Sequence, residues 1–126
     1  MPLSQEEIVK IVDKIQDDYH VSWETRDAKK VAQHYHPQGI LVYLGEWAAR
    51  GRDEIEEKYK EFLKDPVDFK LTYLENLEAG NGEYIIHKGY FTFVTQPDQK
   101  FIYEQIFKRE PDGSYLIYHD EVSIAK

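Results

Sequence analysis

The second half of the chain alternates between long, aromatic-rich segments and short turn sequences. Turns at residues 80–82, 96–99 and 110–113 contain Gly, Asn, Asp or Pro, and they divide the stretch from Asp68 to Ile124 into four predicted strands. Such short turns favour an antiparallel meander. Because apolar residues occupy both faces of each strand, we expect both faces of the sheet to be covered, one by the first half of the chain and the other by a second partner.

The first half of the chain predicts three helices and one strand. Helical periodicity and capping residues predict helices over residues 4–24, 27–37 and 52–65, with Pro66 as the last stop, and residues 39–45 predict a short buried strand. The later strands are long enough to twist and curl, and Gly89 is a predicted site for a bulge or bend.

Helices laid against the concave side of such a curled sheet would enclose a cavity. We therefore predict an α+β fold, in which a cone-like curved antiparallel sheet packs against three N-terminal helices as a single domain over residues 1–126.

Composition limits the class of protein. The net charge of −8 argues against nucleic acid or an anionic membrane as the main partner, because both attract clustered Lys and Arg. The absence of cysteine excludes disulfides, thiol nucleophiles and thiolate metal sites. No apolar run approaches the roughly 20 residues of a membrane-spanning helix, and the first residues lack the order of a signal peptide. We therefore expect a cytoplasmic protein.

A succession of short motifs extends through nearly the whole chain, from about Ile8 to Ser123. In chain order the motifs are Trp23, Arg26-Asp27, residues 50–55 and residues 112–120. No single motif is diagnostic, but their order and spacing resemble the SnoaL-like branch of the nuclear transport factor 2-like superfamily. The resemblance implies a cone-like barrel that usually forms a homodimer through the convex face of its sheet. The family includes isomerases, cyclases, dehydratases, non-catalytic binders and a kinase association domain, so the fold does not select the function.

The same resemblance implies Tyr19 as a candidate catalytic residue. Ketosteroid isomerases place a tyrosine at the corresponding position, where it hydrogen-bonds the developing oxyanion. A helical core tyrosine whose hydroxyl finds a polar partner explains Tyr19 as well. The isomerase also needs a general base on the first strand, where this chain has Tyr43, a poor proton acceptor. The nearest carboxyl to the second acid is Glu104, which strand alternation turns away from the cavity.

His119 and Glu121 are the other catalytic candidates. Strand alternation predicts that they share a face, so one could orient the other as an acid–base pair; a surface pair or a dimer contact would explain them equally. Asp120 lies between them and should point the opposite way. His34 and His36 are two residues apart and do not converge as metal ligands would. We expect no metal and no cofactor.

The predicted pocket is aromatic, with few polar groups, all of them neutral. Its predicted lining is Tyr19, Trp23, Tyr35, Tyr43, Tyr90, Tyr103 and Gln105. The kinase association domain has pocket arginines, whereas the corresponding residues here are Tyr90, Gln105 and Val122, so no anionic ligand is expected.

Such a lining favours binding of a small apolar or aromatic molecule. Together with the convex face of the sheet, it leads us to expect a ligand-binding homodimer. Three alternatives stay open. The first is a cofactor-independent isomerase, cyclase or dehydratase, the second is an oligomerisation module, and the third is a cone that these side chains simply fill.

Overall fold

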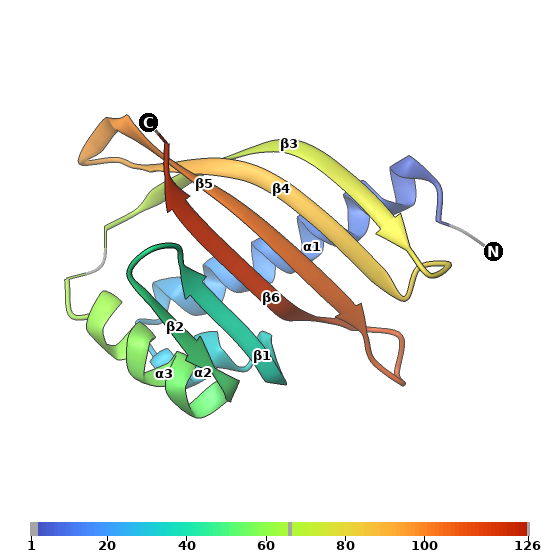
Figure 1. The fold of residues 1–126 in the computed structure, drawn as a ribbon, viewed down its shortest axis with the longest axis horizontal. Helices are drawn as coiled ribbons and strands as arrows, with labels where there is room; N and C mark the ends of the chain where they lie inside the picture. The colour runs from blue at the N-terminus through green and yellow to red at the C-terminus, as the bar shows by residue number, and fades with distance from the viewer. Residues whose placement is uncertain (1–2, 66, 126) are drawn as a thin grey trace.

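The computed structural model describes residues 3–65 and 67–125, in which one curled sheet wraps around three helices (Figure 1). The elements are α1 (Gln5–Glu24), α2 (Ala28–Ala32), β1 (Tyr35–Tyr43), β2 (Trp47–Arg50), α3 (Gly51–Phe62), β3 (Phe69–Ala79), β4 (Tyr84–Phe93), β5 (Gln96–Arg109) and β6 (Tyr115–Ile124). The six strands lie in the order β2-β1-β6-β5-β4-β3. All neighbouring strands are antiparallel except β1 and β6, which run parallel. The predicted α+β cone is confirmed.

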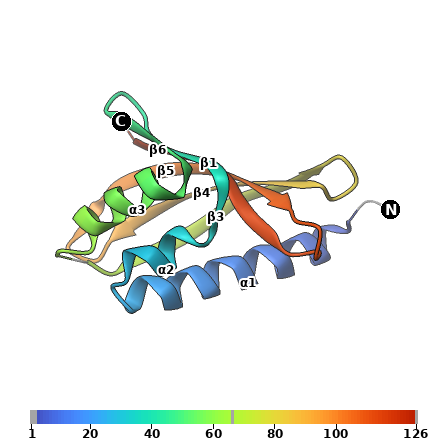
Figure 2. The ribbon, with the colours of Figure 1, turned by 90° about the horizontal axis from the view of Figure 1, so that it is seen from below.

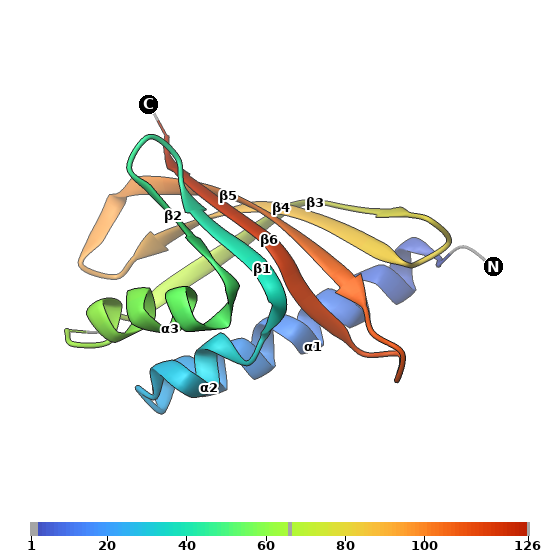
Figure 3. The ribbon, with the colours of Figure 1, turned by 60° about the horizontal axis from the view of Figure 1, so that its bottom comes forward.

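The three helices lie on one side of the sheet and close its concave face (Figure 2). The predicted capping box begins α1, because Ser4 Oγ accepts from the backbone N–H of Glu7 and the Glu7 carboxylate accepts from the backbone N–H of Ser4. Helix α1 then contacts β3, and α3 packs against β1, β2 and α2. In the view of Figure 3 the sheet bends over the helices, which gives the cone its closed and open ends.

An apolar core fills the closed end of the cone, near the turns at residues 80–82 and 110–113. Its fully buried side chains come from α1, α2, β1, α3 and the last three strands: Val12, Val31, Tyr35, Ile55, Ile85, Phe107 and Ile117. The opposite halves of β4 and β5 carry phenylalanines instead, and these are only partly buried. The core therefore holds the sheet and helices together at one end and leaves the other end for a cavity.

Several predicted boundaries were wrong. Helix α2 ends at Ala32, and β1 already begins at Tyr35, so Pro37 lies within a strand rather than ending a helix. Strand β2 was not predicted. Helix α3 ends at Phe62, and its predicted stop at Pro66 lies outside the described residues. The irregularity expected at Gly89 occurs on the opposite strand, where pairing skips Leu74.

Within the described part of the chain, no helix combines the length and the apolar character that crossing a membrane requires.

Candidate functional site

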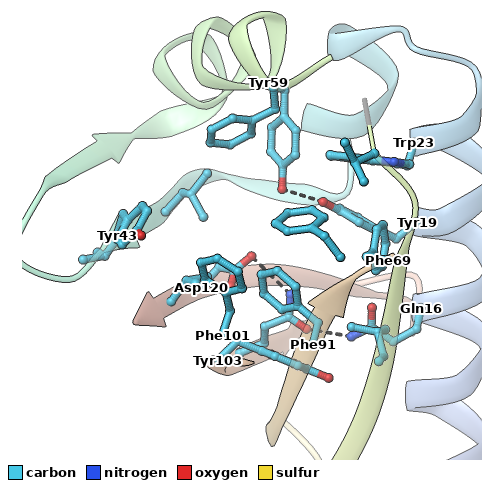
Figure 4. Close-up of a pocket in the computed structure, with 18 of the residues that line it drawn as sticks. Gln16, Tyr19, Trp23, Tyr43, Tyr59, Phe69, Phe91, Phe101, Tyr103 and Asp120 are labelled. Carbon is cyan, nitrogen blue, oxygen red and sulfur yellow. Dashed lines mark hydrogen bonds between the residues drawn. The ribbon is translucent and has the colours of Figure 1, made fainter. Parts of the chain in front are cut away.

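A cavity of about 550 Å³ lies between the concave face of the sheet and the helices α1 and α3 (Figure 4). Its walls are mainly aromatic. The aromatic side chains that line it are Tyr19, Trp23, Tyr43, Trp47, Tyr59, Phe62, Phe69, Phe91, Phe93, Phe101 and Tyr103. The few polar groups include Gln16, Gln105 and Asp120, each more than nine-tenths buried. This size and composition are typical of a site for a small organic molecule.

Asp120 reaches the cavity because β6 is irregular. In the pairing of β5 with β6, Ile106 lies opposite His119 while Phe107 lies opposite Ile117, so Tyr118 has no partner. One extra residue in a strand reverses the faces of all residues beyond it. Ile117 and Asp120 are therefore both buried on the concave side, although simple alternation would separate them.

Three tyrosines connect Asp120 to α1 through a chain of hydrogen bonds, and Figure 4 shows the bond from Tyr59 to Tyr19. The hydroxyl of Tyr35 donates to Asp120 Oδ2 at 2.6 Å. The hydroxyl oxygens of Tyr35 and Tyr59 lie 2.6 Å apart, and those of Tyr59 and Tyr19 lie 2.7 Å apart. The chain thus joins β6, β1, α3 and α1 across the wall of the cavity.

Two glutamine side chains hold the carboxyl group from the other side. Gln105 Nε2 donates to Asp120 Oδ2 at 3.2 Å, and Gln16 Nε2 donates to Gln105 Oε1 at 2.7 Å. Asp120 Oδ2 therefore accepts two hydrogen bonds. Burial raises the pKa of Asp120 above its ordinary value, while its hydrogen bonds with Tyr35 and Gln105 act in the opposite direction. The result is a carboxyl group with stabilised geometry and easier protonation than on a surface.

Burial also keeps the tyrosines of the cavity neutral. Loss of hydration raises the pKa of Tyr19, Tyr35 and Tyr59, and the charge on Asp120 adds to the effect on each. These hydroxyl groups therefore act as hydrogen-bond donors and acceptors, and not as phenolates.

A second polar cluster lies behind Tyr103. His87 is fully buried, with Nδ1 2.6 Å from Asn76 Oδ1 and Nε2 2.8 Å from the Tyr103 hydroxyl. Burial lowers the pKa of His87 to about 4, so the imidazole is neutral at neutral pH. Gly89 makes room for Tyr103, since a Cβ there would lie 2.7 Å from the Tyr103 hydroxyl oxygen and 2.5 Å from the carbonyl oxygen of Thr72.

Five of the seven side chains predicted to line the pocket do so: Tyr19, Trp23, Tyr43, Tyr103 and Gln105. Tyr35 lies behind the wall, fully buried, and contacts the site only through its hydrogen bonds. Tyr90 lies on the convex face, where its neighbour across the strands is the exposed Ile102 and Lys100 Nζ lies 4.6 Å from its ring centroid. The prediction that Tyr90 lines the pocket was therefore wrong.

His119 and Glu121 also lie outside the cavity. They share one face of the sheet, as predicted, and it is the convex face; His119 Nε2 lies 3.9 Å from Glu121 Oε1. Neither side chain lines the cavity that contains Tyr19. The structure thus separates these two catalytic candidates from the third.

Sequence reasoning missed Asp120 and Tyr59 as site residues. Tyr59 lies one helical turn after Ile55, and nothing in that spacing distinguishes a core tyrosine from a cavity tyrosine. For Asp120 one signal was available, because it shares a strand face with Val122, which the family resemblance places at the pocket. The prediction that all polar groups of the pocket are neutral is corrected by this carboxyl group.

A scan against protein-family models finds no match for this chain, and a search of curated proteins finds none either. Several solved structures, in contrast, have a fold similar to that of this chain. A ketosteroid isomerase-like protein from Erwinia carotovora atroseptica has a TM-score of 0.73 and 17% identity, over 98% of this chain and 99% of that chain. A protein of unknown function from Nostoc punctiforme with a cystatin-like fold has a TM-score of 0.76 and 12% identity, over 99% and 96%.

A candidate calcium/calmodulin dependent protein kinase II association domain from Xanthomonas campestris is also similar, with a TM-score of 0.73 and 21% identity over 90% of this chain and 85% of that chain. These identities are too low to transfer an activity, and proteins of such a fold differ widely in what they do. The shared feature is the architecture, and the chain has the cystatin-like, nuclear transport factor 2-like cone fold.

Proposed function

We propose that this protein binds a small, flat, largely apolar molecule inside the cone. The observation that carries the proposal is the cavity of about 550 Å³, whose walls are mainly aromatic and which contains three buried polar side chains, Gln16, Gln105 and Asp120. Aromatic walls bury a flat ligand with little loss of side-chain entropy, and a few fixed polar groups orient it. Assignment to the SnoaL-like branch remains a prediction.

The proposal includes a homodimer that pairs through the convex face of the sheet. A row of mostly aliphatic side chains crosses this face on neighbouring strands: Leu77, Ile86, Ile106, His119 and Ile40. Ile102, on the same face, is 47% exposed, and Leu77 is 43% exposed. Such a band of apolar groups on a wide sheet supports contact with a second copy.

An acid–base enzyme of the ketosteroid isomerase type is the second candidate, favoured by Asp120. A buried carboxyl group with a raised pKa, beside tyrosine hydroxyls in an apolar cavity, has the properties of a general acid or base. An isomerisation assay on Δ5-ketosteroids tests this reading with two variants, Tyr19→Phe and Asp120→Asn. Turnover that either variant reduces at least about 100-fold would support catalysis; equal rates for all three proteins would remove both residues from it.

Native mass spectrometry of the purified protein tests binding and assembly together. The proposal predicts a dimer that retains a small molecule or takes up 2-naphthol when it is added. A ring of many ligand-free subunits would instead favour the oligomerisation module, the third candidate. A monomer that retains a ligand would contradict the dimer and leave the binding proposal standing.

A further inference from the structure

The direction of the hydrogen bonds around the cavity indicates which chemical groups of a ligand it can receive. A tyrosine hydroxyl has one proton to donate and oxygen lone pairs that accept. Tyr35 donates its proton to Asp120 Oδ2. The proton between Tyr35 and Tyr59 must therefore come from Tyr59, and the proton between Tyr59 and Tyr19 must come from Tyr19. Tyr19 is left with lone pairs to offer to the cavity.

The hydroxyl proton of Tyr103 is also engaged within the protein, by a separate route. Asn76 Oδ1 can only accept, so the proton of the neutral His87 imidazole lies on Nδ1, 2.6 Å away. His87 Nε2 then has no proton and accepts from the Tyr103 hydroxyl at 2.8 Å. The Tyr103 proton is thus directed at the buried His87, so Tyr103 offers no hydrogen-bond donor to the cavity.

Asp120 adds a second acceptor and a negative charge. Within residues 3–65 and 67–125, both hydrogen bonds to this carboxylate go to Oδ2, and none goes to Oδ1. Among the described residues that line the cavity, none is Lys, Arg or His. A buried carboxylate without a cation is costly, and a donor from a ligand would reduce that cost.

We propose that the ligand is a flat apolar molecule that donates hydrogen bonds from a hydroxyl or a protonated amine to the acceptors Tyr19 and Asp120. This inference rests on the proposed binding function and defines its ligand class. It also distinguishes the cavity from an oxyanion site, which needs a free donor at Tyr19. A carbonyl oxygen only accepts hydrogen bonds, so a carbonyl compound would find no donor at Tyr19 or Asp120.

Four naphthalenes of similar size test the ligand class by calorimetry at neutral pH. 2-Naphthol and 2-(aminomethyl)naphthalene donate, 2-acetylnaphthalene only accepts, and 2-methylnaphthalene does neither. Hydrogen bonds to charged groups contribute about 1.5–3 kcal/mol, so at least one donor is expected to bind roughly 10-fold or more tightly than the last two compounds. The tighter of the two donors identifies a neutral hydroxyl or a cation. Equal or tighter binding of 2-acetylnaphthalene would overturn the inference.

Tyr35→Phe tests whether the chain of tyrosines sets this preference. Without the Tyr35 oxygen, Tyr59 has no acceptor on that side and donates to Tyr19, which frees the Tyr19 proton for the cavity. The affinity ratio of 2-naphthol to 2-acetylnaphthalene is expected to fall at least about 5-fold. As a control, Tyr84→Phe removes a hydroxyl that does not belong to the hydrogen-bonded series of tyrosines, and it should leave this affinity ratio unchanged. An unchanged ratio in Tyr35→Phe would contradict the inference.

A ligand-free measurement keeps the inference testable if none of the four naphthalenes binds, a result that would contradict only the proposed function. Buried hydroxyl protons in short hydrogen bonds give downfield NMR signals that single Tyr→Phe variants assign. In Tyr19→Phe, the Tyr59 proton should keep its signal, because it is bonded to Tyr35. Loss or a large shift of that signal would mean that Tyr59 donates to Tyr19, and this would overturn the inference.

Discussion

At the scale of single residues, His87 links folding to pH. Burial lowers its pKa from 6.5 to about 4. Between these two values the unfolded chain binds a proton that the folded protein does not, so the free energy of unfolding falls as the pH is lowered from about 6.5 towards about 4. The stabilising contribution is fully present above the unfolded-state pKa. Each pKa unit corresponds to about 1.4 kcal/mol, so His87 accounts for a loss of about 3 kcal/mol.

Urea unfolding of His87→Gln across this pH range measures the effect. The variant is expected to be less stable than the wild type at neutral pH and to lose less stability on acidification, because it lacks the titrating imidazole. Tyr103→Phe serves as the control, since it removes one hydrogen-bond partner of His87 and keeps the ring. Identical acid slopes for His87→Gln and the wild type would show that another group causes the pH dependence.

Residue patterns predicted part of the site and could not predict the rest. Tyr19 and Gln105 were found through the family resemblance, and Tyr103 shares the strand face of Gln105 in regular alternation. Tyr90 was misplaced, because it pairs with Ile102 on the convex face of the sheet. Asp120 was overlooked as a site residue, although it was correctly expected to point away from His119 and Glu121. No residue type in β6 marks the bulge that brings Asp120 to the same face as Ile117.

At the scale of elements, the long helix and the four long strands were predictable, and the short elements were not. The spacing from Ala28 to Tyr35 suggests a continued helix, but the chain turns after Ala32 and Tyr35 is buried from a strand instead. Pro37 is tolerated in β1 because pairing with β6 is interrupted between Tyr35 and Ile40, so no ladder hydrogen bond is lost. Strand β2 spans only Trp47–Arg50, too few residues for a clear alternation.

The capping box of α1 gives a test at this scale. Ser4→Ala removes the oxygen that accepts from the Glu7 N–H at 3.1 Å, and the free energy of unfolding should fall by about 1 kcal/mol. Ser4→Asp keeps an acceptor at the same position and should restore most of the loss. Urea denaturation monitored by circular dichroism measures both variants. A loss well below about 0.5 kcal/mol in Ser4→Ala would show that the cap does not stabilise α1 in the folded protein.

At the scale of the whole molecule, the two faces of the sheet have different roles. The concave face and the helices enclose the cavity, whereas the convex face carries the aliphatic row that includes Ile86 and Ile106. The fold of the chain follows from its long curled strands. Its chemistry depends on a few polar side chains whose positions are set by one bulge and a set of hydrogen bonds between distant segments.

Ile106→Arg tests the proposed pairing through the convex face. A charge in the middle of a buried apolar row would have to lose its hydration, so the dimer should dissociate to monomers or the protein should aggregate. Val94→Arg places the same charge on the exposed turn between β4 and β5 and should leave the dimer intact. Light scattering coupled to size-exclusion chromatography reports the mass. An intact Ile106→Arg dimer would place the interface elsewhere.

The most direct test of the central claim, that the cone holds a ligand, compares one substitution inside the cavity with the same substitution outside it. Val122 lines the cavity, and Val94 is 62% exposed. We predict that Val122→Trp obstructs the part of the cavity beside β6 and weakens calorimetric binding of 2-naphthol at least about 10-fold, whereas Val94→Trp binds as the wild type does. Equal binding by all three proteins, or no binding by the wild type, would contradict the claim.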